Sequence, residues 1–256
     1  MYRLGVDLGG TNIAVAVVDE NYNIVGRAKT KTDAHRPAAE ICDSIAATAK
    51  EAIKTAGLEI EDIVSAGIGT PGSVVPSKGM VTYANNFAGF SNLPLCAMLK
   101  ERLGIDFYID NDANAAAYGE YLAGAGVGTK DFIAVTLGTG VGSGIVFDGQ
   151  VLTGCNDAGG ELGHMTIKFD GEPCNCGRIG CWERYASATA LINQTKKAME
   201  ENKFCLYQAN TVKDKMFSVA KVQPNFSNTI AKIGNCINWL IEGMTPDQII
   251  AENTNY

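Results

Sequence analysis

The chain has 256 residues, of which 46% are apolar and 19% are charged, and its net charge is −7. This length allows two ordinary domains or one large one, with apolar residues enough for a sizeable core. An acidic chain lacks the basic surface of a nucleic-acid-binding protein, and no apolar run could span a membrane. The strand-like start does not resemble a signal peptide, so we expect a cytoplasmic protein with reduced cysteines.

The first half of the chain predicts an α/β domain that opens with antiparallel strands. Three β-rich runs flank a Gly-Gly turn and form a meander. Pro37 stands where a helix would begin, and apolar residues then recur at helical spacing as far as Gly57. Residues 70–95 are rich in Pro, Gly, Ser and Asn and predict a loop. The predicted strands are residues 3–8, 13–18, 24–30, 63–68 and 107–109, and the predicted helices are residues 37–57, 95–103 and 113–123.

The second half of the chain begins in the same way. Strands predicted at residues 132–137 and 145–147 flank the Gly-rich run 138–144, so strand, Gly/Thr turn and strand occur twice. This repetition indicates an internal duplication with a boundary in a Gly-rich stretch. The predicted domains are residues 1–124 and 125–256, and the remaining predicted elements are helices at 183–201 and 230–241 and an apolar run at 248–251.

Two glycines and a threonine after the first strand are suited to bind a phosphate. Gly9 and Gly10 let the backbone approach an anion, and the hydroxyl of Thr11 can donate to a phosphate oxygen. Asp7, at the end of the strand, can hold the water shell of Mg²⁺. A plain hairpin turn is the simpler interpretation of this motif alone. The second copy at residues 138–144 favours a pair of loops that grip a triphosphate from both sides.

A Gly-x-Gly-x-x-Gly run at residues 67–72 follows a predicted strand, as a dinucleotide fingerprint does. Pro71 and residues 73–76 do not start a helix, so we interpret this run as a tight loop. The sequence contains no Gly-x-x-x-x-Gly-Lys-Ser/Thr phosphate loop.

A polar cluster, Asp-Asn-Asp-Ala-Asn at residues 110–114, lies between a predicted strand and an Ala-rich helix. Asp and Asn are favoured as helix N-caps, so spacing alone predicts a cap here. A cap at one residue is compatible with a catalytic role at another, and both interpretations stay open.

Three cysteines and a histidine form the sharpest motif of the sequence. Cys174, Cys176 and Cys181 lie within eight residues, and His164 precedes the first of them by ten. Three thiolates and an imidazole are a standard tetrahedral zinc set. Reduced or disulfide-bonded cysteines are the alternative, but the dense cluster and a reducing compartment favour zinc. The other five cysteines are scattered singly and are expected in the core.

Taken together, these motifs resemble those of the ROK family of sugar kinases. The resemblance covers residues 4–192, and the residues after Cys181 are most similar to those of bacterial members that phosphorylate glucose. It rests on Asp7-Leu8-Gly9-Gly10-Thr11, Gly69-Thr70-Pro71-Gly72, Asn111-Asp112-Ala113-Asn114, Leu137-Gly138-Thr139-Gly140-Val141-Gly142, Glu161-Leu162-Gly163-His164 and the run from Cys174 to Glu183.

The resemblance implies an α/β fold of the actin-like type, a duplicated ribonuclease H-like arrangement of two domains with a cleft between them. It implies ATP-dependent phosphorylation of a hexose, glucose above all, at the 6-hydroxyl, with Mg²⁺, a structural Zn²⁺ and a homodimer. Asp112 becomes the general base. The implied sugar ligands are Gly72, Asn86, Asn111, Asp112, Gly142, Glu161, His164 and Glu183; the nucleotide ligands are Asp7, Gly9, Gly10, Thr11, Asn12, Gly138, Thr139 and Gly140; the zinc ligands are His164, Cys174, Cys176 and Cys181.

N-acetylmannosamine, N-acetylglucosamine and fructose stay open as substrates, and a non-catalytic sugar-sensing regulator is the rival from another class. Regulators of this family carry an N-terminal helix-turn-helix domain. The predicted first strand starts at Arg3 and Asp112 is present, and both favour a kinase. Residues 203–226 depart from the family pattern, and no glycine turn follows residues 246–250, so the resemblance predicts an incomplete adenine pocket.

Overall fold

A computed structural model describes residues 1–84 and 87–200 of the chain. The described residues fall into two compact units, one of Met1–Thr136 and Gly142–Leu162, and one that contains Leu137–Val141 and Gly163–Glu200. The division of the chain at residue 124 stays a prediction. The predicted helix at residues 230–241, the apolar run after it and Asn86 lie outside the described residues. No helix among the described residues is long and apolar enough to cross a membrane.

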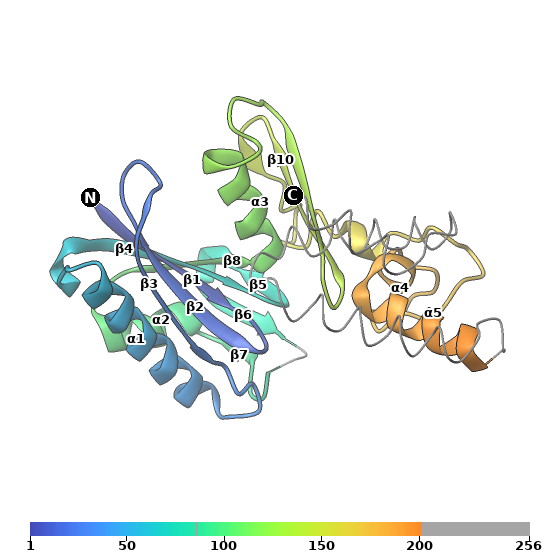
Figure 1. Ribbon diagram of the computed structural model, residues 1–256, viewed down its shortest axis with the longest axis horizontal. Helices are drawn as coiled ribbons and strands as arrows, with labels where there is room; N and C mark the ends of the chain where they lie inside the picture. Colours follow the sequence, from blue (N-terminus) through green and yellow to red (C-terminus); the bar gives the residue numbers. More distant parts are fainter. Residues whose placement is uncertain (85–86, 201–256) are drawn as a thin grey trace, which may run out of the picture. The chain divides into compact units, whose positions relative to one another are not determined.

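A five-stranded sheet organises the first unit (Figure 1). Its order is β3-β2-β1-β4-β8; the first three strands form an antiparallel meander, and β1, β4 and β8 run parallel. The strands are β1 (Tyr2–Leu8), β2 (Asn12–Val18), β3 (Ile24–Lys31), β4 (Ile63–Thr70) and β8 (Phe107–Asn111), and the helices are α1 (Ala38–Thr55), α2 (Leu95–Leu103) and α3 (Asp112–Ala123). The predicted meander and helices are confirmed within one or two residues at most ends.

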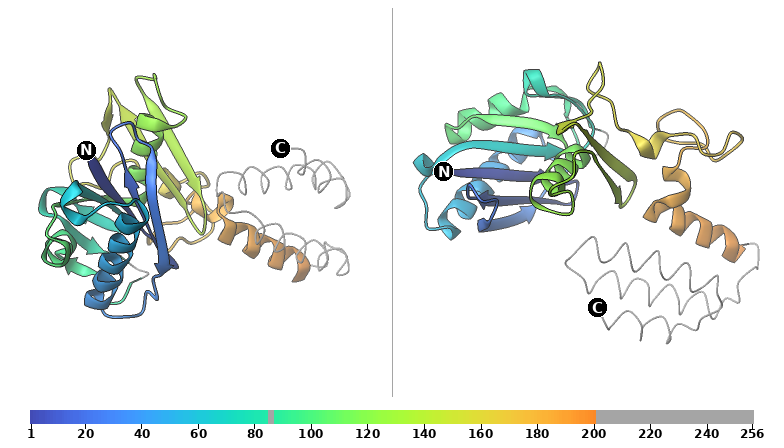
Figure 2. Two further views of the ribbon diagram at one scale, coloured as in Figure 1. Left: turned by 60° about the vertical axis from the view of Figure 1, so that its left-hand side comes forward. Right: turned by 90° about the horizontal axis from the view of Figure 1, so that it is seen from above.

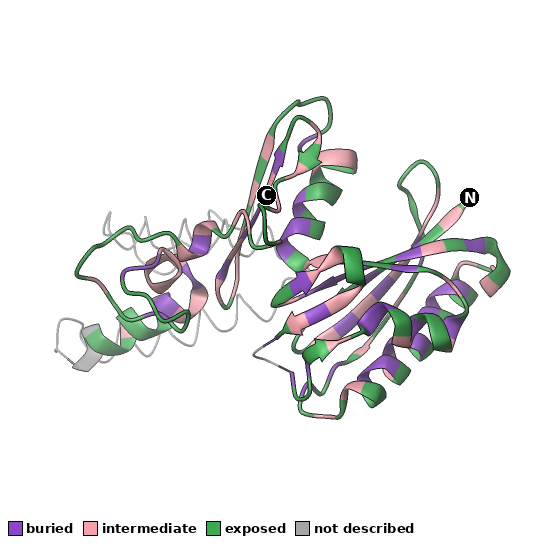
Figure 3. Cartoon of the chain, turned by 180° about the vertical axis from the view of Figure 1, so that it is seen from behind, coloured by how far each residue is buried: buried purple, intermediate pink, exposed green. Residues whose placement is uncertain are grey.

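Alternation along the strands separates the two faces of the sheet. Leu4, Val6 and Leu8 of β1 are buried and lie beside Ala66 and Ile68 of β4. This face carries α1 and α2, and α3 packs on β4 and β8 from the other side (Figures 1 and 2). Most of the buried residues of this unit gather between the sheet and α1 and α2 (Figure 3).

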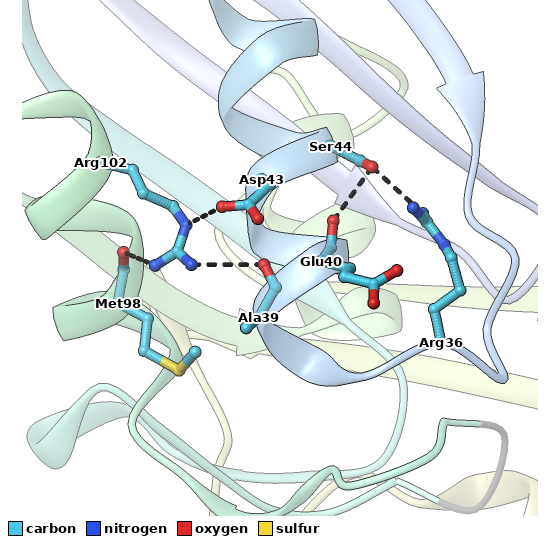
Figure 4. A network of polar contacts seen from close by, with 7 residues as sticks. All are labelled: Arg36, Ala39, Glu40, Asp43, Ser44, Met98 and Arg102. Carbon is cyan, nitrogen blue, oxygen red and sulfur yellow. Dashed lines mark hydrogen bonds and ion pairs between the residues drawn. The ribbon is translucent and has the colours of Figure 1, made fainter.

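Polar contacts tie α1 to α2 at the edge of this core (Figure 4). The guanidinium of Arg102 on α2 donates to the carboxylate of Asp43 at 2.6 Å and to the backbone oxygen of Ala39 at 3.3 Å, both on α1. It also donates to the backbone oxygen of Met98 at 2.9 Å. Arg102 is mostly covered but the carboxylate of Asp43 is exposed, so the ion pair itself contributes little to stability.

The structure corrects three of the predicted boundaries. Residues 70–95 are not one loop, because β5 (Ser73–Val75), β6 (Met80–Tyr83) and β7 (Ser91–Leu93) form a small sheet that buries Val74 and Val81. The second Gly/Thr turn is shorter than predicted, because β10 already begins at Val141. The predicted helix 183–201 is two helices, because Ser187 ends the first and its hydroxyl caps the second at the N–H of Ala190, 3.0 Å away.

The elements of the second half are β9 (Phe132–Leu137), β10 (Val141–Phe147), β11 (Gln150–Val151), α4 (Glu183–Ala186) and α5 (Ala188–Glu200). Single 3₁₀ turns lie at Ile60–Asp62, Pro76–Lys78 and Leu162–His164.

Candidate functional site

The first Gly/Thr loop is the turn between β1 and β2. The N–H of Gly9 donates to the backbone oxygen of Asn12 at 3.0 Å and closes this turn, which contains Gly10 and Thr11. The run Gly67–Gly72 is different: β4 continues through Thr70, and β5 rather than a helix follows. A dinucleotide fingerprint needs a helix at that point, so the structure agrees with the rejection of that motif. The tight-loop interpretation is wrong for Gly67–Thr70, which belong to β4, and the chain turns only at Pro71 and Gly72.

Sheet register brings Asp7 and Asp112 together within the first unit. Asp7 pairs with Gly69 of β4 on one side and with Ala14 of β2 on the other, and Ala14 in turn pairs with Lys29 of β3. A Cβ at Gly69 would lie 3.4 Å from the Cα of Asp112. Because Gly69 has no side chain, the start of α3 can pack directly on β4 beside Asp7.

The pKa values of both carboxyl groups are raised. Burial raises the pKa of Asp112 above the ordinary 3.8, although backbone N–H groups that bond to the carboxylate oppose this. Burial also raises the pKa of Asp7, the negative charge of Asp112 raises it further, and Lys29 lowers it. A carboxylate with a raised pKa is a better proton acceptor than a solvated one, which suits a general base.

These shifts predict that Asp112→Asn stabilises the folded protein at neutral pH. The neutral acid is favoured in the folded state, so its stabilisation is present below pH 3.8 and is lost as the pH rises through the raised pKa. Asn keeps a neutral group at every pH. The variant should therefore unfold at a higher urea concentration than the wild type at pH 7, and the difference should shrink toward pH 4. A difference that does not depend on pH would contradict the cause of the shift.

The polar cluster at residues 110–114 is a helix cap, as the spacing predicts. Asn111 is the N-cap of α3, and its side-chain oxygen accepts from the N–H groups of Ala113 at 2.9 Å and Asn114 at 3.3 Å. Its Nδ2 donates to the backbone oxygen of Gly72 at 3.2 Å. Asp112 occupies the first helical position, so the cap fixes the residue that carries the carboxylate.

Glycines and one serine hold the segment after α3 against that helix. A Cβ at Gly142 on β10 would lie 3.1 Å from the Cβ of Ala113, so a side chain there would push the strand away from α3. The buried hydroxyl of Ser143 donates to the backbone oxygen of Gly160 at 2.5 Å and accepts from the N–H of Leu162 at 2.9 Å. One side chain thus fixes the residues on either side of Glu161.

The second Gly/Thr loop and Glu183 belong to the second unit. Oε2 of Glu183 accepts from the N–H of Val141 at 3.0 Å. A Cβ at Gly140 would overlap the same carboxylate, so a side chain there would displace Glu183 from this bond. Ala188 and Thr189 donate to the backbone oxygens of Gly138 and Thr139. A predicted sugar ligand and a predicted phosphate loop are therefore joined by a hydrogen bond that the sequence does not reveal.

The four predicted zinc ligands converge in the second unit. The ligand atoms of His164, Cys174, Cys176 and Cys181 all lie within 4.8 Å of one another. The sulfur of Cys174 is 3.7 Å from Nδ1 of His164, and the sulfurs of Cys176 and Cys181 are 3.6 Å apart. Tetrahedral zinc with bonds of about 2.3 Å to sulfur and 2.0–2.1 Å to nitrogen requires edges of about 3.6–3.8 Å. The donor set and its spacing fit zinc.

The loop is shaped to hold these ligands. Gly180 has a φ of +72°, and a Cβ there would overlap the backbone oxygen of Lys168, so glycine is needed on both counts. The hydroxyl of Tyr185 accepts from the N–H of Glu172 at 2.8 Å and holds the loop to α4. Burial, together with the neighbouring thiols, raises the pKa of Cys181 to about 12, so only a bound cation would favour its thiolate at neutral pH.

The isolated cysteines behave differently from this cluster. Cys42 and Cys96 are buried in the core of the first unit, as predicted, and burial raises the pKa of each to about 11. They are inert apolar residues at neutral pH. Cys155 is exposed, which corrects the expectation that every isolated cysteine lies in the core.

The described residues form an α/β protein with a capped helix beside two carboxyl groups and with two Gly/Thr turns. The ROK family model matches residues 3–253, and the chain belongs to the ROK family. It is 34% identical to a glucokinase of Halalkalibacterium halodurans over 97% of the chain and 79% of that protein. It is 40% identical to a glucokinase of Thermotoga maritima over 73% of the chain but only 58% of that protein.

A solved structure supports the same assignment. The crystal structure of a ROK family glucokinase from Streptomyces griseus, in complex with glucose and AMPPNP, matches with a TM-score of 0.70 and 36% identity. The match covers 87% of this chain and 65% of that one, so the chain spans about two thirds of the solved protein. These likenesses confirm the predicted actin-like fold.

Proposed function

We propose that the chain phosphorylates a hexose at its 6-hydroxyl with ATP, and that the hexose is glucose. One observation carries the proposal: Asp112 begins α3 beside Asp7, at the same end of the sheet as the Gly9–Asn12 turn. A proton acceptor and a phosphate loop in one unit are the parts that phosphoryl transfer needs. The glucokinases that the chain resembles support glucose as the substrate.

In this proposal Asp112 accepts the proton of the 6-hydroxyl while the hydroxyl oxygen bonds to the γ-phosphorus of ATP. The bond from that phosphorus to the bridging oxygen breaks, and ADP leaves. A base of this kind contributes about 10²- to 10⁴-fold. Asn111 and Glu183 offer amide and carboxylate groups that can hold sugar hydroxyls, and the backbone at Gly72 and Gly142 can do the same. Glu161 and His164 complete the proposed sugar ligands within the described residues. Asn86 is proposed from the resemblance alone.

Positive charge and phosphate contacts complete the proposed machinery. The turns with Gly9, Gly10, Thr11 and Asn12 and with Gly138, Thr139 and Gly140 offer backbone N–H groups and hydroxyls to the phosphates. Mg²⁺, held through water at Asp7, would neutralise charge on the phosphates. Zinc on Nδ1 of His164 would leave the proton on Nε2, which can donate to a sugar oxygen. The expected homodimer, interdomain cleft and cytoplasmic location stay predictions.

A substrate panel with the purified chain tests the proposal. ADP release should be measured with glucose, N-acetylmannosamine, N-acetylglucosamine and fructose, each with ATP and Mg²⁺. We expect the highest kcat/KM with glucose. Measuring DNA retention with and without sugar tests whether the chain is instead a sugar-sensing regulator. If none of the sugars supported ADP release and DNA retention depended on sugar, the results would favour a sensor over a kinase.

A further inference from the structure

We propose that Thr32 and Thr189 are positioning residues for the two Gly/Thr loops. The hydroxyl of each threonine donates to a backbone oxygen of its loop and so helps to turn the N–H groups of the loop toward the phosphates. This inference rests on the proposed function, because it concerns the binding of nucleotide phosphates. Neither residue belongs to a motif in the sequence, and neither lies within a Gly/Thr loop.

Thr32 holds the first loop with two donors. It follows β3 and is fully buried. Its hydroxyl donates to the backbone oxygen of Gly9 at 2.6 Å, and its N–H donates to the backbone oxygen of Thr11 at 3.0 Å. Both oxygens that flank Gly10 in the turn are therefore drawn to one buried residue. Two bonds to one buried residue hold the turn in one conformation.

Peptide geometry converts these bonds into an orientation for the N–H groups. The C=O of one residue and the N–H of the next point in opposite directions across a planar trans peptide. Because the oxygen of Gly9 faces Thr32, the N–H of Gly10 points away from it. A loop whose oxygens are bound internally presents N–H groups outward, which is the arrangement that attracts an anion.

The second loop is held in the same way from α5. The hydroxyl of Thr189 donates to the backbone oxygen of Thr139 at 2.7 Å, and the N–H of Ala188 donates to that of Gly138 at 2.9 Å. By the same geometry, the N–H groups of Thr139 and Gly140 point away from α5. In both loops one threonine hydroxyl and one backbone N–H from outside the loop bind two loop oxygens.

Arg36 fixes the position of Thr32 in turn. Its Nη2 donates to the backbone oxygen of Thr32 at 2.7 Å. The same nitrogen donates to the hydroxyl of Ser44 on α1 at 3.1 Å (Figure 4). The N–H, hydroxyl and carbonyl of Thr32 are all engaged. The first loop is thereby connected to the α1 face of the sheet through one buried side chain.

Two matched pairs of variants test the inference. Thr32→Val and Thr189→Val remove the hydroxyl and keep the shape. Thr48→Val and Thr195→Val are the controls, because their hydroxyls donate to helix oxygens, of Ser44 at 2.7 Å and of Leu191 at 2.8 Å. Thr32→Ser keeps the hydroxyl and should restore binding. Calorimetry with Mg²⁺·ADP gives the nucleotide Kd, and steady-state rates give separate KM values for ATP and hexose.

We expect Thr32→Val and Thr189→Val to weaken Mg²⁺·ADP binding about five- to thirtyfold, and the two controls and Thr32→Ser to change it less than about twofold. In the Thr32→Val variant the KM for ATP should rise while the KM for hexose stays unchanged. Unchanged Kd values, or equal losses in the control variants, would overturn the inference. A wild-type chain that binds Mg²⁺·ADP but phosphorylates no hexose would overturn the proposed function alone. A wild-type chain that binds no Mg²⁺·ADP would contradict both.

Discussion

Asp112→Asn is expected to lower kcat by about 10²-fold or more and to leave the hexose affinity nearly unchanged. The amide keeps the size and hydrogen-bonding shape of the side chain but cannot accept the proton of the hydroxyl. The Asn111 cap and the packing of α3 on β4 do not depend on the charge, so the variant should fold. Stopped assays for ADP and calorimetry with glucose measure the two effects separately.

Asp110→Asn is the matched control for this variant. Asp110 lies two residues earlier, and its Oδ1 accepts from the N–H of Asn111 at 2.7 Å and from Nδ2 of Asn114 at 3.1 Å. The control therefore disturbs the start of α3 without removing the proposed base, and we expect it to keep most of kcat. If Asp112→Asn retained more than a few per cent of kcat, Asp112 would not be the base.

Cys176→Ser is expected to release zinc and to weaken hexose binding. Wild-type protein prepared without chelator should contain one zinc per chain, because the Cys₃His ligand atoms converge and two of their distances match those of tetrahedral zinc. A serine cannot replace the thiolate as a strong zinc ligand, so the variant should contain little metal. His164 would then lose its fixed orientation, and the hexose Kd should rise about tenfold or more.

Cys155→Ser is the control, because Cys155 is an exposed cysteine outside the cluster and its loss should change neither zinc content nor hexose affinity. Elemental analysis measures the zinc, and calorimetry measures the hexose. Wild-type protein without zinc would refute the metal site. A zinc-free Cys176→Ser variant with wild-type hexose affinity would refute only the coupling through His164.

Local signals in the sequence predict most of the first unit. Pro37 marks the start of α1, and Gly104 marks the C-terminal end of α2. The alternation of residues in β1 predicts which face of that strand is buried. The short strands β5, β6 and β7 escape prediction, because Pro, Gly, Ser and Asn dominate their segment and each strand buries few residues. Their pairing is decided by tertiary contacts, which composition does not show.

The candidate site, too, can be predicted from the sequence only in part. Zinc ligands cluster within a short segment, so spacing alone finds them. Thr32, Ser143 and the bond from Val141 to Glu183 depend on residues that are 17 to 42 positions apart in the chain. A single buried threonine or serine carries no distinctive pattern in one sequence. Only the arrangement of strands shows which backbone atoms such a hydroxyl meets.

The transfer itself is measured most directly by ³¹P NMR of the purified chain with ATP, Mg²⁺ and glucose. A hexose kinase should produce glucose 6-phosphate and ADP in equal amounts, and the Asp112→Asn protein should produce almost none. Folded wild-type protein that binds glucose and Mg²⁺·ADP, yet forms no sugar phosphate from glucose or from the other hexoses of the panel, would contradict the proposed activity.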